Sequence, residues 1–197
     1  MLRRTLLLAA GFAAPLGTAG AQRSLVPDPT PRIPPQPGQG LPVADARALQ
    51  RAARLSDAQV EAGRLAAEQA TSAEIRQLAA RIAEDHARFR QTAGELAAAR
   101  RVELPDRAAA GIEDRSFTAL REASGEAFDR AFLARQLGLY RLMAELYQTM
   151  ASNSPDAALS RFGITALASV RAHFETARAL GARFGLRVDT IENPPQY

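Results

Sequence analysis

Residues 71–101 carry apolar side chains at steps of three or four residues along their whole length. The repeated positions are Ile75, Leu78, Ile82, His86, Phe89, Ala93 and Leu96. On a helix with 3.6 residues per turn, this spacing places them all on one face. The segment is therefore predicted to be one long amphipathic helix that buries this face against other elements. His86, one of only two histidines in the chain, is expected to point into the core.

Three more long segments have the same helical periodicity, and these are residues 44–70, 124–152 and 154–184. The first of them reaches residues 71–101 with almost no link, so those two helices must be antiparallel neighbours. Residues 106–124 are predicted to form a crossover with a short helical piece at 117–122. The predicted fold is therefore all-α, an up-down four-helix bundle with a crossover between the second and third long helices.

Local signals mark two of the helix starts. Thr71 and Glu74 have the spacing of a capping box at the start of the second helix. Ser154, Pro155 and Asp156 supply a cap, a proline and an acid in the order that favours a helix start. The fourth long helix is expected to begin there.

The second histidine, His173, lies about two-thirds of the way along the fourth helix, on its apolar stripe. In a bundle with one crossover, the second and fourth long helices run antiparallel, so positions near their middles come level. We therefore expect His86 and His173 to be buried and to face one interior layer. Glu61 and Tyr140 are expected close by, although Glu61 lies about 40° from Leu65 at the edge of its stripe.

The N-terminal 21 residues have the pattern of a secretory signal peptide. Arg3 and Arg4 precede a short apolar run at 5–17, and the small residues 19–21 follow it. The run is too short to span a membrane, and the paired arginines leave a twin-arginine export route open. We expect a mature protein that begins near Gln22 and is periplasmic or secreted.

Residues 22–43 are dense in proline, which forbids helix and favours an extended, disordered linker. A PxxP-type docking motif is the sharper alternative for this stretch. Residues 44–185 are predicted to be the helical domain, and residues 186–197 a short C-terminal tail.

The charge pattern argues against a nucleic-acid partner. The formal net charge is only +4, and all 25 basic residues are arginine. They form no basic block and no basic-aromatic patch. The chain has no cysteine, so disulfides are excluded, and no segment after the signal has the length of a transmembrane helix.

Four features of the predicted domain, in order, carry a family resemblance. These are EAGRLA at 61–66, IAEDH at 82–86, GEAFDRAF at 125–132, and His173. Together they resemble the exported bacterial family known as domain of unknown function 4142. The resemblance covers residues 44–185 and implies a ferritin-like bundle, but no settled activity. Where the family usually has a third histidine, this chain has Tyr140.

The histidines suggest two interpretations. A di-iron site of the ferritin type needs Glu-x-x-His pairs, but Ala83 and Val170 stand three residues before the histidines. A simpler divalent metal site with Glu61, His86 and His173 as ligands remains open, because carboxylate and imidazole suit zinc, iron or copper. Otherwise each histidine hydrogen-bonds to a buried acid, hydroxyl or carbonyl. The structural polar layer then includes Tyr140, Asp129 and Gln136.

No nucleophile–base–acid arrangement or phosphate-binding loop is present, so neither a catalytic residue nor an organic cofactor is predicted. We therefore expect an exported helical-bundle protein with a non-catalytic binding or stress-related role. The alternative is a metal-binding protein that uses Glu61, His86 and His173. A third option is a docking module that uses the proline-rich linker. The sequence names no partner and no oligomeric state.

Overall fold

The computed structural model describes residues 40–105 and 115–187, and its helices all belong to one compact unit. The helices are α1 (Val43–Gln69), α2 (Ala73–Arg100), α3 (Arg115–Glu122), α4 (Gly125–Asn153) and α5 (Ala157–Arg183). They correspond to the predicted segments, with ends shifted by a few residues. The predicted signal peptide, nearly all of the linker, part of the crossover and most of the tail lie outside the described residues.

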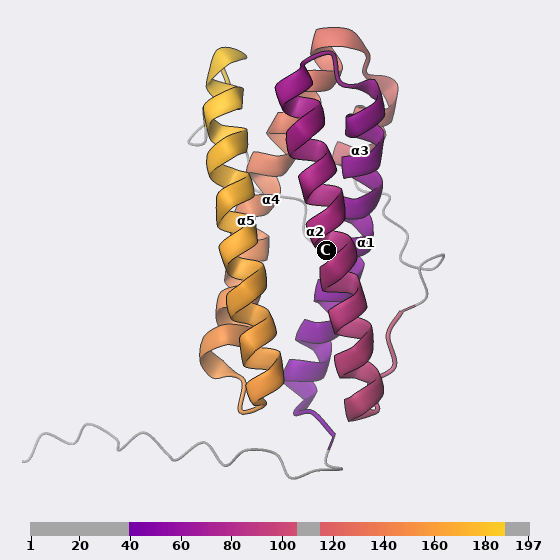
Figure 1. Ribbon diagram of the computed structural model, residues 1–197, viewed down its shortest axis with the longest axis vertical. Helices are drawn as coiled ribbons and strands as arrows, with labels where there is room; N and C mark the ends of the chain where they lie inside the picture. The colour runs from indigo at the N-terminus through magenta and orange to yellow at the C-terminus, as the bar shows by residue number, and fades with distance from the viewer. Residues whose placement is uncertain (1–39, 106–114, 188–197) are drawn as a thin grey trace, which may run out of the picture. The chain divides into compact units, whose positions relative to one another are not determined.

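The four long helices form a bundle in which α1 packs against α2, and α4 packs against α5 (Figure 1). Contacts between helix ends establish their directions. The starts of α2 and α4 meet where Asp129 accepts a hydrogen bond from the backbone N–H of Thr71. The end of α2 meets the start of α5, where Arg100 forms an ion pair with Asp156. Because α2 and α4 run parallel and α5 returns against them, the predicted all-α topology is confirmed.

Both predicted start signals need correction. The N-cap of α2 is Ser72, whose hydroxyl accepts from the backbone N–H of Ile75, while the Thr71 hydroxyl donates to Asp129 instead. The N-cap of α5 is Asp156, two residues later than predicted. Its carboxylate accepts from the first turn of α5, which satisfies donors that have no partner within the helix.

Two apolar clusters fill opposite ends of the bundle. One joins the N-terminal halves of α1 and α5 to the C-terminal halves of α2 and α4, and the other joins the remaining halves. Each long helix has at least one polar residue where it passes from one cluster to the other, and one such residue from each helix defines a layer. These residues are Gln59, His86, Gln136 and His173, which we call the central polar layer.

Two glycines let paired helices approach closely. A Cβ atom on Gly63 of α1 would lie 2.7 Å from the carbonyl oxygen of Ala79 on α2. A Cβ atom on Gly163 of α5 would lie 2.6 Å from the backbone nitrogen of Ala151 on α4. These contacts are with backbone atoms, so the close spacing of each helix pair requires glycine. Within the described residues, no helix combines the length and apolar character that crossing a membrane needs.

Candidate functional site

His86, near the middle of α2, is completely buried, and neither ring nitrogen has a hydrogen-bond partner among the described residues. Its ring packs edge-on against Phe89, with ring centres 5.1 Å apart. Burial, assisted by the nearby charges of His173 and Arg135, lowers the pKa of His86 from 6.5 to about 3. The imidazole is therefore neutral near pH 7. The expectation that this histidine pairs with a buried acid, hydroxyl or carbonyl is wrong within the described chain.

His173 on α5 faces His86, and their ring centres are 6.2 Å apart. Its Nε2–H donates to the Oδ2 of Asp85 across 2.8 Å. Burial lowers the pKa of His173, while the hydrogen bond to Asp85 opposes that shift. The His173 side chain is 13% exposed, so both histidines are largely buried and share one layer, as expected.

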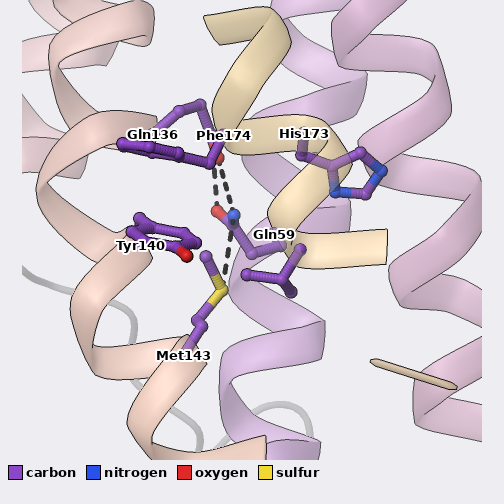
Figure 2. Close-up of a pocket in the computed structure, with 7 residues that line it drawn as sticks. Gln59, Gln136, Tyr140, Met143, His173 and Phe174 are labelled. Atoms are coloured by element: carbon purple, nitrogen blue, oxygen red, sulfur yellow. Dashed lines mark hydrogen bonds between the residues drawn. The ribbon is translucent and has the colours of Figure 1, made fainter. Parts of the chain in front are cut away.

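Gln59 organises the interior of the central polar layer. Its Nε2–H donates to the Oε1 of Gln136 at 2.7 Å, and its Oε1 accepts from the Nη1 of Arg135 at 2.7 Å. Figure 2 shows Gln59 between Tyr140 and His173, with dashed bonds to Gln136 and to the Met143 sulfur. The bonded residues come from two helices, so the network ties α1 to α4.

Sequence reasoning missed Gln59 and Arg135, although a positional signal was present. Gln59 lies four residues after Leu55 and three before Ala62, which is the spacing of the buried face. Arg135 similarly follows Phe132 by three residues. Both are buried in the structure. Their polarity hid them, because a search for apolar stripes passes over a glutamine or an arginine at a core position.

A small cavity adjoins this network, lined in part by Gln59, Gln136 and Val170. The space open to the centre of a water molecule is about 10 Å³. That is roughly the volume that a single water needs, about 10–15 Å³ by the same measure. The rings of Tyr140 and Phe174, stacked with centres 3.9 Å apart, also line it. This cavity has no room for an organic substrate.

Glu61 does not join the histidines. Its carboxylate forms an ion pair with Arg121 of α3 at 2.5 Å, and its side chain is 44% exposed. Across residues 40–105 and 115–187, no three His, Cys, Asp or Glu side chains are grouped so that they could hold a metal ion. The predicted ligand set of Glu61, His86 and His173 is therefore not assembled. The physical reason is that Glu61 stands at the edge of its stripe, where α3 supplies a cation.

Asp129 also lies outside the layer, although it is buried as predicted. It precedes Gln136 by seven residues, about 10 Å along the helix axis. Its carboxylate accepts from the backbone N–H groups of Thr71 and Ser72 and from the Thr71 hydroxyl. Asp129 therefore anchors the link between α1 and α2. Of the three residues predicted for the polar layer, Gln136 and Tyr140 are found beside the histidines, and Asp129 is not.

The chemistry available to this site is narrow. Asp85 is the only hydrogen-bond partner of His173 within the described chain, so no hydroxyl there is aligned for activation by this imidazole. His86 has the lowered pKa often found at functional sites, but it has no contact with solvent. The arrangement can orient helices and hold one uncharged imidazole in the core.

Comparison with known proteins gives one match. A family model described as "Domain of unknown function (DUF4142)" matches residues 30–180, which is most of the chain. No curated protein and no solved structure matches.

Proposed function

The chain belongs to the DUF4142 family, and we propose that it is an exported helical-bundle protein with a non-catalytic binding role. In this proposal the central polar layer is structural and holds the four long helices in register. The observation that carries it is the enclosure of His86, the side chain on which catalysis in this layer would depend. That residue has no exposed surface, and the adjoining cavity is about the size of one water.

A register role follows from the placement of the layer between two apolar clusters. If α1 moved by one turn against α4, Gln59 would lose Gln136 and Arg135 and would enter an apolar region. An unpaired buried polar group costs ~1–3 kcal/mol. The correct register is therefore favoured over shifted ones. A single buried polar residue sets the register of a coiled coil in the same way.

Chemical labelling of the histidines tests the non-catalytic role. Diethyl pyrocarbonate modifies imidazoles that solvent can reach, and mass spectrometry locates the adducts. In the native protein His86 should stay unmodified and His173 should react slowly, whereas both should react after denaturation. Rapid labelling of native His86 would reveal an accessible site and would argue for chemistry in the layer.

Export is the second part of the proposal, and it is supported by the N-terminal pattern of Arg3, Arg4 and the small residues 19–21. N-terminal sequencing of protein from a periplasmic extract should give a chain that starts near Gln22. An intact Met1 end on cytoplasmic protein would contradict export while leaving the structural role of the layer untouched.

Metal binding is the alternative function, and one observation favours it. Both ring nitrogens of His86 are without partners among the described residues, as those of an unoccupied ligand would be. Against it, the His173 nitrogen is held by Asp85 and the Glu61 carboxylate by Arg121. A metal would have to break both pairs to assemble the three ligands. We therefore favour the structural role.

A further inference from the structure

A second hollow lies on the surface where α1 and α4 pack together, away from the central polar layer. Its volume is about 350 Å³, within the range of about 300–1,000 Å³ that small-molecule sites occupy. Arg47, Ala48 and Arg51 of α1 line it from one side, and Leu142 and Leu146 of α4 line it from the other. We call these five residues the α1–α4 groove.

The two arginines of the groove carry charge that the described chain does not neutralise. Neither has an ion pair or hydrogen bond within residues 40–105 and 115–187, whereas Arg88, Arg90 and Arg100 of α2 are each paired with a carboxylate. The one acid at the groove, Glu145, is bound to Arg141 instead, at 2.9 Å. The groove therefore presents positive charge without a counterion of its own.

The guanidinium of Arg51 has a buried donor without a partner in the described chain. Its Nε is shielded from solvent, yet it has no hydrogen-bond acceptor among the described residues. A shielded N–H of a guanidinium that lacks an acceptor is costly, and an anion beside the guanidinium would offset part of that cost. A carboxylate is the acceptor whose two oxygens best match the planar donors of arginine.

We propose that the α1–α4 groove binds a small amphipathic carboxylate, with its head group on Arg51 and Arg47 and its hydrocarbon chain along Leu142 and Leu146. The half-buried Ala48 also lines the groove, and its side chain is a single methyl group. This goes beyond the proposed function, because it assigns a ligand class to a site that the polar layer does not share.

Titration calorimetry of the full chain with decanoate, below its micellar concentration, tests the proposal. One decanoate should bind, whereas acetate lacks the hydrocarbon chain and decyltrimethylammonium has the wrong charge, so neither should bind. R51Q should lower the affinity for decanoate by about tenfold or more, because it removes the ionic anchor. L142S should weaken binding by shortening the apolar floor, and R51K should give an intermediate value, since lysine lacks the planar fork.

R171Q supplies the matched control, because Arg171 is exposed on α5 and does not line the groove. Its affinity for decanoate should equal that of the wild type. Circular dichroism must show the same helicity and melting temperature in every variant that is compared. No decanoate binding, or equal binding by R51Q, L142S and R171Q, would overturn the proposal. A dimer that R51Q dissociates would also overturn it, because the groove would then be occupied by a second copy of the chain.

Discussion

The Nε2 of His173 lies 2.8 Å from the Oδ2 of Asp85, the residue that directly precedes the buried His86. Two adjacent residues of α2 therefore have different roles in the same layer. Asp85 is 20% exposed and holds α5 by a hydrogen bond, while His86 is sealed beneath it without any hydrogen bond in the described chain. The pair closes the edge of the layer.

Neutralising the acid of this pair should move the pKa of its histidine. In D85N the negative charge that opposes the effect of burial is lost, so the pKa of His173 should fall below its wild-type value. Stability should decrease by ~1 kcal/mol, because a weaker acceptor remains. Histidine NMR signals followed against pH measure the pKa. E84Q is the control, since Glu84 is exposed and pairs with Arg88, and an equal shift there would contradict the assignment.

The two histidines should differ when each is replaced by leucine at pH 7.5. H86L removes a desolvated imidazole that has no hydrogen bond in the described chain, so the melting temperature should be unchanged or higher. H173L leaves Asp85 without its partner and should cost ~1–3 kcal/mol. Thermal unfolding followed by circular dichroism compares them. A larger loss for H86L than for H173L would mean that His86 has an interaction that this account lacks.

Acid should destabilise the protein as the pH falls below about 6.5. The pKa of His86 is about 3 when folded and about 6.5 when unfolded, so below pH 6.5 protons favour the unfolded chain. The loss grows by ~1.4 kcal/mol per pH unit for His86 as pH falls toward 3, and His173 adds to it in the same direction. Urea unfolding between pH 8 and 5 measures the slope.

The ion pair between Glu74 and Arg183 does not obscure this window. The hydrogen bond from Arg183 lowers the pKa of Glu74 from 4.5, so the stability that this pair gives is lost only below that value. H86L should show a clearly shallower fall between pH 6.5 and 5. An identical slope in wild type and H86L would show that His86 does not bind the proton on unfolding.

Much of the fold was readable from helical periodicity. The stripe through His86 set the face of α2, and the almost missing link at Thr71 required α1 and α2 to be antiparallel. The level meeting of His86 and His173 followed from those directions. The caps shifted by one or two residues, because neighbouring polar side chains compete at each start. Thr71 competes with Ser72 at α2, and Ser154 competes with Asp156 at α5.

The candidate site was less predictable, since its decisive contacts join different helices. Glu61 was predicted to lie with the histidines only from its angular position on α1. That position does not reveal the ion pair that Glu61 forms with Arg121 of α3. Helical periodicity within α2 does not reveal the partner of Asp85, because its bond to His173 joins α2 to α5. Gln59 was overlooked because a search for apolar residues does not find a polar residue at a core position.

The glycine at the α1–α2 contact should tolerate no side chain. G63A would place a Cβ atom 2.7 Å from the Ala79 carbonyl oxygen and 2.9 Å from the Ala83 backbone nitrogen. The two helices would have to separate, at a cost of ~1–3 kcal/mol. G94A is a matched control in the interior of α2, where the nearest atom is an Arg90 side-chain nitrogen at 3.8 Å. It should instead stabilise by up to ~1 kcal/mol, and chemical unfolding distinguishes the two signs.

We propose that the polar layer around His86 and His173 is structural and is not a metal site. The most direct test is the melting temperature of the purified protein with added Zn²⁺ or Fe²⁺ and after chelation. Metal at one hundred times its dissociation constant would add ~2.7 kcal/mol, which raises the melting temperature of a domain this size by several degrees. We predict no change in wild type, H86L or H173L. A metal-dependent rise in wild type that both variants lose would contradict the account.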